Sequence, residues 1–434
     1  MVEVVIKKTE KLNGEVRAPP SKSYTQRMLI ASALSNGNSK ISNPLLSDDT
    51  EATLRAITAL GAKVTQAEGC WTVTGAESLS NAKEPIYCGE SGATLRFMVP
   101  VAALAPDPSK LVFNGSLQRR PIEPLIKSLY DLGAKVCLKK FGNKDAVIVE
   151  GGGILGGETS IPGNVSSQFI SGLLFACPLA KVKTEIKLST PLESVDYVKM
   201  TLEVLEQFGI RVDVYDCFDR FVIPANQTFK PNDCIVPGDF SSAAFLLAAA
   251  AITHSTVKIN DLNYENPQGD RAILGILSEM GVEGKVCEHS VEINGSGNPL
   301  EPINLEAKNI PDLVPAVAAL ACFTKGTTHI TGAERLKLKE SDRLAALHSE
   351  LKKMGAQINL EPDGLTIKGQ APLYGISVDS HNDHRIAMAC AVAALRAERD
   401  TTILNAGCIR KSYPQFFTHL KLLGAEIVGG KFDR

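Results

Sequence analysis

Six copies of one sequence pattern divide the chain into units of similar length. Each copy has apolar residues three and four positions apart, then a glycine, then a short β-like run, as in "LRAITALGAKV" and "FTHLKLLGAEI". This pattern predicts an amphipathic helix that ends at a glycine in the left-handed conformation and leads into a strand. Consecutive glycines are separated by 72, 76, 72, 74 and 69 residues, so six units account for the whole chain. The glycines are Gly61, Gly133, Gly209, Gly281, Gly355 and Gly424.

A second helix precedes each amphipathic one, as in "SSQFISGLLFACPL" and "DFSSAAFLLAAAAI". Beyond its first turn it is small and apolar on nearly every face, which is typical of a helix that is buried all round. Short alternating runs such as "TVKINDL" follow and predict strands of outer sheets that cover these helices. The sequence therefore predicts an α/β fold of six β-α-β-α-β-β repeats, three in each of two lobes. Strand signals in every unit argue against a solenoid made of helices alone.

Composition narrows the range of partners. The chain has 46 basic and 48 acidic residues, so no overall electric field favours nucleic acid or an anionic membrane. We therefore expect small-molecule substrates, with no nucleic-acid and no membrane partner. The ten cysteines include no CxxC pair, which is typical of free thiols in a reducing compartment. The segment "MVEVVIKKTE" lacks the apolar core of a signal peptide, and we expect a cytoplasmic protein.

The buried helices turn polar where they are expected to begin. Free backbone N–H groups and the helix dipole make such starts natural anion sites. In "KLKESDRLAALHSELKKMG", from residue 337 to 355, Ser341 is the predicted N-cap. Counting thirteen residues back from three repeat glycines gives Arg120, Asp342 and Lys411, which predicts charge at one structural position in three units. The cations gathered at helix starts are Lys22, Arg27, Arg96, Arg119, Arg120, Lys339, Arg343, Arg385 and Lys411.

These cations are too many for one monoanion, and the planar fork of arginine suits carboxylates and phosphates. A pair of substrates that carry phosphates and carboxylates would match them. The sequence has no GxxxxGK[ST] loop, and "GGGILGG" lacks the spacing of a dinucleotide fingerprint, so nucleotide-dependent phosphoryl transfer is disfavoured. His381 and His384 are three residues apart without a third ligand, so no metal site is predicted.

Eight motifs lie between residue 19 and residue 414: "PPSKSYTQR", "GESGATLR", "QRRPI", "SSQF", "IPDLVP", "KESDR", "NDHRIAM" and "RKSYP". In order and spacing they resemble the motifs of the 5-enolpyruvylshikimate-3-phosphate synthase family. The resemblance implies a two-lobed inside-out α/β barrel, with one lobe at 20–235 and the other formed by 1–19 and 236–434. It places the active site in the cleft between the lobes, and the predicted oligomeric state is a monomer.

The resemblance also implies the reaction. Phosphoenolpyruvate and shikimate 3-phosphate condense, phosphate leaves and an enol ether remains, with no cofactor. Asp312 would accept the proton of the attacking hydroxyl, Glu340 would protonate the methylene carbon of phosphoenolpyruvate, and Lys22 would assist. The shikimate 3-phosphate site would comprise Lys22, Ser23, Arg27, Ser166, Ser167, Gln168, Ser194, Tyr197, Asp312 and Lys339. The phosphoenolpyruvate site would comprise Lys22, Gly92, Arg120, Gln168, Arg343, Arg385 and Lys411.

Two alternatives remain open on the sequence. A sister family transfers enolpyruvate to UDP-N-acetylglucosamine, but it typically carries a reactive cysteine in the loop that corresponds to 114–121, which here reads "NGSLQRRP". The other alternative is a catalytically silent anion-binding protein on the same fold. The chain also departs from the family pattern at Arg335, Glu90 and Ala93, where asparagine, asparagine and threonine are frequent.

Overall fold

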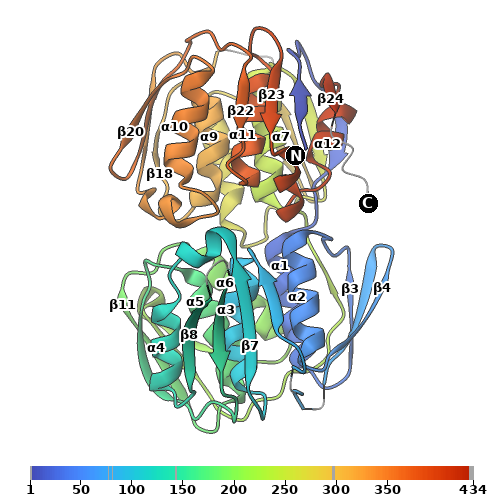
Figure 1. The fold of residues 1–434 in the computed structure, drawn as a ribbon. Coiled ribbons are helices and arrows are strands. Elements are labelled where there is room, and N and C mark those ends of the chain that lie inside the picture. Colours follow the sequence, from blue (N-terminus) through green and yellow to red (C-terminus); the bar gives the residue numbers. More distant parts are fainter. Residues whose placement is uncertain (1, 77, 81, 142–143, 296–298, 430–434) are drawn as a thin grey trace. The chain divides into compact units, whose positions relative to one another are not determined.

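The computed structural model describes residues 2–76, 78–80, 82–141, 144–295 and 299–429 (Figure 1). The chain divides into two compact units by its internal contacts. Unit 1 combines Met1–Pro19 with Pro237–Arg434, and unit 2 is Pro20–Val236. The two connections between the units therefore lie at Pro19–Pro20 and at Val236–Pro237.

Unit 2 contains the first three repeats. Its buried helices are α1 (Lys22–Leu34), α3 (Gly92–Ala103) and α5 (Ser167–Ala176), and its amphipathic helices are α2 (Asp48–Ala59), α4 (Glu123–Asp131) and α6 (Val195–Gln207). Its short 3₁₀ helices are η1 (Gly115–Arg119), η2 (Cys177–Leu179) and η3 (Asp216–Phe218). Its strands are β3 (Asn38–Ser42), β4 (Lys63–Ala67), β5 (Cys70–Thr74), β6 (Ile86–Gly89), β7 (Ser109–Asn114), β8 (Val136–Phe141), β9 (Lys144–Val149), β10 (Gly157–Pro162), β11 (Thr184–Thr190), β12 (Asp213–Tyr215), β13 (Arg220–Ile223) and β14 (Cys234–Ile235).

Unit 1 contains the other three repeats. Its buried helices are α7 (Phe240–Ile252), α9 (Val314–Ala321) and α11 (His384–Ala394), and its amphipathic helices are α8 (Ile273–Glu279), α10 (Arg343–Lys353) and α12 (Phe416–Leu422). Its 3₁₀ helices are η4 (Gly269–Ala272), η5 (Pro311–Leu313), η6 (Glu334–Leu338) and η7 (Ala406–Lys411). Its strands are β1 (Val4–Ile6), β2 (Asn13–Arg17), β15 (Thr256–Asn260), β16 (Glu283–Cys287), β17 (Ser290–Asn294), β18 (Asn304–Glu306), β19 (Thr327–Thr331), β20 (Gln357–Glu361), β21 (Gly364–Lys368), β22 (Ser377–Asp379), β23 (Thr401–Leu404) and β24 (Ile427–Gly429).

The described residues form six four-stranded sheets with one shared topology. In each sheet one outer strand pairs in parallel with its neighbour and the other two pairings are antiparallel, as in β6-β7-β9-β8 and β18-β19-β21-β20. Three sheets take a strand from a distant part of the chain. β14 lies beside β3, β2 lies beside β15, and β1 lies between β23 and β24. In both units, therefore, strands that are distant in the sequence complete the sheets.

Each unit has helices inside and sheets outside, as the sequence predicts (Figure 1). In unit 1, helices α7, α9 and α11 pack against one another, and every residue of α7 is buried. The many alanines of these helices allow their backbones to approach closely while the larger side chains fill the space under the sheets. Among the described residues no helix combines the length and apolar character needed to cross a membrane.

All six repeat glycines adopt positive φ, which confirms the predicted helix stops. Their φ angles are 107° at Gly61, 83° at Gly133, 77° at Gly209, 86° at Gly281, 105° at Gly355 and 102° at Gly424. At Gly281 the N–H donates to the Ser278 carbonyl, and the next N–H, of Val282, donates to Leu277. These bonds satisfy carbonyls at the C-terminal end of α8 and direct the chain into β16.

Helix α8 offers a matched pair of glycine substitutions. Gly281 has positive φ, and a Cβ added there would have no neighbour within 4 Å, so Gly281→Ala introduces backbone strain without a clash. Gly275 lies inside the helix, also with nothing within 4 Å of an added Cβ. We expect Gly281→Ala to lower the free energy of unfolding by about 1–2 kcal/mol and Gly275→Ala to raise it by about 0.5–1 kcal/mol. Urea unfolding measures both, and equal effects of the two substitutions would contradict the left-handed stop.

Candidate active site

Arg343, the first residue of α10, binds three carboxylates in unit 1. Its Nη1 donates to Asp312 Oδ1 at 2.8 Å, its Nη2 donates to Glu340 Oε2 at 2.6 Å, and its Nε donates to Asp383 Oδ2 at 2.8 Å. These four residues are called the Arg343 cluster below. The arginine side chain is only 1% exposed, and the side chains of Asp312 and Glu340 are each 14% exposed. The cluster is therefore a nearly dry group of charges, in which Asp312 and Glu340 are more exposed than Arg343.

Burial lowers the pKa of Arg343, but the charges of Asp383, Glu340 and Asp312 more than offset it, so the pKa rises above its usual value. The guanidinium is thus a permanent charge. Asp383 is wholly buried and also caps α11, because its Oδ1 accepts the Arg385 N–H at 3.0 Å. An anion at a helix N-terminus is stabilised by the helix dipole, which fixes Asp383 beside the arginine.

Two further cations surround Asp312. Arg385 Nη1 donates to the Asp312 carbonyl oxygen at 2.9 Å, and its Nη2 lies 3.3 Å from Oδ2. Lys339 Nζ lies 3.5 Å from Asp312 Oδ1. Burial lowers the pKa of Lys339 to about 8, since the attraction of Asp312 is opposed by the positive charges of Arg343 and Arg335. Asp312 therefore has three cationic side chains within 3.5 Å of its carboxylate oxygens.

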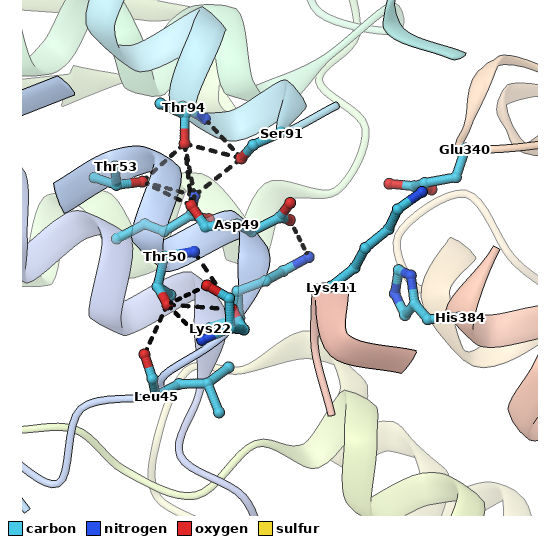
Figure 2. Close-up of polar contacts among 12 residues, drawn as sticks. Lys22, Leu45, Asp49, Thr50, Thr53, Ser91, Thr94, Glu340, His384 and Lys411 are labelled. Atoms are coloured by element: carbon cyan, nitrogen blue, oxygen red, sulfur yellow. Dashed lines mark hydrogen bonds and ion pairs between the residues drawn. The ribbon is translucent and has the colours of Figure 1, made fainter. Parts of the chain in front are cut away.

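Lys411 lies at the end of η7, and its Nζ donates to the Asn382 carbonyl oxygen at 2.8 Å. Asn382 directly precedes Asp383 in the turn before α11. Lys411 and the Arg343 cluster therefore both contact the same short segment. Figure 2 shows Lys411 with His384 of that helix start and with Glu340.

In unit 2, Lys22 at the start of α1 is paired with Asp49 in the first turn of α2. The Nζ–Oδ2 distance is 2.8 Å, and the side chains are 19% and 13% exposed. The backbone carbonyl of Asp49 accepts hydrogen bonds from Gln26, Thr53 and Thr94 at 3.3 Å each (Figure 2). Packing of α1, α2 and α3 thereby fixes the position of the lysine's partner.

Arg27 is buried one turn after Ser23 on α1. It donates to the Ser23 carbonyl at 2.9 Å, to the Tyr197 carbonyl at 2.9 Å and to the Thr201 hydroxyl at 2.8 Å. Burial lowers its pKa to about 10, against the raising effects of Tyr197 and Tyr24. Ser194, the N-cap of α6, has φ 56° in the left-handed region. Arg27 therefore ties the start of α1 to the start of α6.

Gln168 and Arg120 are positioned by neighbouring residues in unit 2. Arg96 Nη1 donates to Gln168 Oε1 at 2.7 Å, at the start of the helix that Ser166 caps and Ser167 begins. A Cβ on Gly92 would lie 3.0 Å from both terminal nitrogens of Arg120, so glycine makes room for the guanidinium. Glu90 Oε1 accepts the Ser116 N–H at 2.9 Å and anchors η1, the 3₁₀ helix that precedes Arg120. This contact gives a structural role to a residue that departs from the family pattern.

Comparisons with known proteins show the family of this chain. A model of the family described as EPSP synthase (3-phosphoshikimate 1-carboxyvinyltransferase) matches residues 6–420. The chain belongs to this family. It is 44% identical to the 3-phosphoshikimate 1-carboxyvinyltransferase of Methanocella arvoryzae, covering 95% of this chain and 97% of that protein, and 40% identical to that of Methanocaldococcus jannaschii, covering 98% and 99%. The solved EPSP synthase of Acinetobacter baumannii superimposes with a TM-score of 0.83 at 27% identity, covering 99% of this chain and 100% of that one. The predicted fold class and family are confirmed.

Two predictions about the starts of the amphipathic helices were wrong. Asp342, not Ser341, is the N-cap, because its Oδ1 accepts the Ala345 N–H at 3.1 Å. Ser341 instead donates its hydroxyl to Asp383 at 3.1 Å. The count of thirteen residues also does not give one structural position: Arg120 precedes α4 by three residues, and Lys411 ends η7. The count fails because α4, α10 and α12 have 9, 11 and 7 residues.

Three acids were not assigned a role by sequence reasoning. Asp49 and Asp383 each bind a cation, yet acids at helix starts are ordinary and gave no signal of their own. Asp270, in η4, is 3% exposed. Only the structure shows this burial, since the sequence "NPQGDRA" resembles a solvated turn.

Asp270, the last of these three acids, interacts electrostatically with Arg385 and Asp312. The Ser241 hydroxyl donates to its Oδ2, whereas its Oδ1 is buried and has no hydrogen-bond partner among the described residues. Burial, together with the charge of Asp312, raises the pKa of Asp270 to about 7 against the attraction of Arg385. A group with a raised folded-state pKa prefers to be protonated, so it lowers stability increasingly as the pH rises from the unfolded pKa to the folded one.

We expect Asp270→Asn to stabilise the protein more at pH 8 than at pH 5. Asparagine cannot ionise, so it removes a penalty that grows from about pH 4 to pH 7 and is bounded at about 4 kcal/mol. Urea unfolding across this pH range measures the difference. Asp400→Asn, at an exposed position, is the matched control and should show no comparable trend. An Asp270→Asn effect that does not change with pH would contradict the buried, proton-binding carboxyl.

Proposed function

We propose that this protein transfers the enolpyruvyl group of phosphoenolpyruvate to the 5-hydroxyl of shikimate 3-phosphate and releases phosphate. The observation that carries the proposal is the pairing of Asp312 and Glu340 on one buried, permanently charged arginine, Arg343. Membership in the EPSP synthase family supports it. No metal or nucleotide takes part in the proposed reaction.

The reaction proceeds by addition and elimination. Glu340 takes up a proton and gives it to the methylene carbon of phosphoenolpyruvate, while the 5-hydroxyl oxygen bonds to the adjacent carbon and passes its proton to Asp312. In the tetrahedral product Glu340 then takes back a proton from the new methyl group, the double bond of the enol ether forms, and phosphate leaves with the proton that Asp312 had accepted. Lys22 assists the proton transfers. Lys339, Arg343 and Arg385 hold the Asp312 side chain in position for this role.

Each substrate has its own set of proposed binding residues, and Lys22 and Gln168 belong to both sets. Cations and helix N-termini bind the phosphate and carboxylate groups, since both substrates are multiply charged anions. Phosphoenolpyruvate is bound by Lys22, Gly92, Arg120, Gln168, Arg343, Arg385 and Lys411. Shikimate 3-phosphate is bound by Lys22, Ser23, Arg27, Ser166, Ser167, Gln168, Ser194, Tyr197, Asp312 and Lys339. We further propose that the protein is a cytoplasmic monomer.

A phosphate-release assay tests this function. The protein should release phosphate when both phosphoenolpyruvate and shikimate 3-phosphate are present, and not with either alone. Replacement of shikimate 3-phosphate by UDP-N-acetylglucosamine should abolish release, in keeping with the loop 114–121, which contains no cysteine. Release with the nucleotide sugar would support the sister reaction, and no release with either acceptor would support a silent anion-binding protein.

Isosteric substitutions test the two acids. Asp312→Asn and Glu340→Gln keep the shape of each side chain but remove the proton acceptor or donor, so we expect each to slow kcat by about a hundredfold or more. Both acids also bind Arg343, so circular dichroism and urea unfolding should accompany the kinetics. Asp342→Asn is the matched control, because asparagine is also a good N-cap. Rates near wild type in either acid variant would contradict the assigned role.

The lowered pKa of Lys339 predicts a pH dependence. In the free protein the ammonium group loses its proton as the pH rises through about 8, and with it the charge that attracts the substrate phosphate. We therefore expect kcat/KM for shikimate 3-phosphate to fall above about pH 8. Lys339→Arg keeps the charge and should move this fall to higher pH. A wild-type profile that stays level to pH 9.5, or an unchanged profile in Lys339→Arg, would exclude this titration.

A further inference from the structure

Glu350, on the same helix as Arg343, is a buried acid with no part in the proposed chemistry. Its side chain is 0% exposed. Lys353 Nζ binds both carboxylate oxygens at 2.8 Å, His381 Nε2 lies 2.8 Å from Oε1, and the Asp379 N–H donates to Oε2 at 3.0 Å. Burial alone raises the pKa of Glu350, but these donors hold it below its usual value, so the carboxylate is ionised at neutral pH.

Two of those donors, Asp379 and His381, belong to residues 379–383, which lead from the last residue of β22 to the N-cap of α11 and are called the turn below. In this turn His381 has φ 52° and Asn382 has φ 55°, so two consecutive residues other than glycine are left-handed. Such residues cost on the order of 1 kcal/mol each or more and persist only where their surroundings hold them. Within the turn, Asp379 Oδ1 accepts the His381 N–H at 2.9 Å, and the Ser380 hydroxyl accepts the Asn382 N–H at 3.2 Å. From outside the turn, the Glu350 carboxylate contacts the N–H of Asp379, the first residue of the turn, and the ring of His381.

The turn leads directly to the proposed phosphoenolpyruvate residues of unit 1. Asp383, its last residue, binds Arg343. Arg385 follows in the first turn of α11, and the Asn382 carbonyl accepts the Lys411 ammonium group at 2.8 Å. Three of the proposed phosphoenolpyruvate ligands, Arg343, Arg385 and Lys411, are therefore fixed by this one segment.

Helix α10 contacts the segment at two points. Arg343 and Glu350 are seven residues apart, which is close to two helical turns, so both lie on the same face of α10. The first binds Asp383 and the second binds Asp379 and His381. The arginine and the acid thus hold the two ends of the turn against one helix.

From this geometry we infer that Glu350 is a positioning residue for phosphoenolpyruvate: it holds the left-handed turn at His381 and Asn382, which sets Arg385 and orients the carbonyl that binds Lys411. The inference rests on the proposed function, because it concerns how that site binds one of its two substrates. Glu350 does not itself contact a substrate in this account.

The test is Glu350→Gln, which keeps the size of the side chain but removes its charge and points an amide N–H₂ group at donors. We expect KM for phosphoenolpyruvate to rise about tenfold or more, KM for shikimate 3-phosphate to change less than about twofold, and kcat to fall less than the phosphoenolpyruvate KM rises. Lys353→Gln is the matched control, since it removes the ion pair with Glu350 without touching the turn. It should leave both KM values near wild type.

His381→Asn keeps the inference testable if Glu350→Gln does not fold. Asparagine tolerates the left-handed conformation but is too short to reach Glu350 as the imidazole does. We expect a smaller rise, about threefold, in KM for phosphoenolpyruvate alone. Equal rises in both KM values, unchanged kinetics in both variants, or the same effect from Lys353→Gln would overturn the positioning role.

Amide hydrogen exchange separates this inference from the proposed function. If Glu350 holds the turn, Glu350→Gln should accelerate exchange at residues 379–385 more than Lys353→Gln does, whether or not the protein turns over. A wild-type protein that releases no phosphate would refute the proposed function, while faster exchange in that segment would still support the structural part of the inference. Unchanged exchange there would overturn it.

Discussion

The structure of unit 1 depends on the guanidinium group of Arg343, which is almost completely buried. Removing a charge from water is costly, and only close carboxylates with good hydrogen-bond geometry compensate for it. Asp312, Glu340 and Asp383 do so at distances of 2.6–2.8 Å. Each comes from a different place, since Asp312 lies in η5, Glu340 precedes α10 and Asp383 caps α11. The same bonds that stabilise the arginine therefore fix how the starts of three helices lie relative to one another, and two of the three acids are those proposed to transfer protons.

The repeat architecture explains how such a group arises. Every repeat places a buried helix and an amphipathic helix under a sheet, so packing of repeats brings the starts of equivalent helices together. A helix start combines free N–H groups with a positive dipole, and it is also where the chain leaves the apolar core and polar residues are tolerated. Unit 2 uses the same principle with different residues, pairing Lys22 at the start of α1 with Asp49 in the first turn of α2.

Sequence reasoning predicted the fold well because the fold follows from the periodic spacing of apolar residues and glycines along the chain. The six glycines, the buried helices and the outer strands each have a local signal, and the structure confirms them. The site was predicted less completely. The polar residues at helix starts were identified, but not which of them pair, because pairing depends on the packing of helices far apart in the sequence. Asp49 and Asp270 illustrate this: an acid near a helix start has the same sequence signal whether it is solvated, bound to a lysine or buried beside another acid. The roles of individual residues in the reaction remain predictions.

The strands β1 and β2 have a consequence for the order of folding. β1 pairs with β23 and β24 in one sheet, and β2 pairs with β15 in another. The strands of unit 2, in contrast, all come from residues 20–236. During synthesis the ribosome makes β1 before the whole of unit 2, yet the partners of β1 emerge only after residue 400. Unit 2 therefore has all of its strands available while β1 still lacks both neighbours. Pairing of β1 thus waits for residues made almost 400 positions later, so substitutions in β1 act on a late step of assembly.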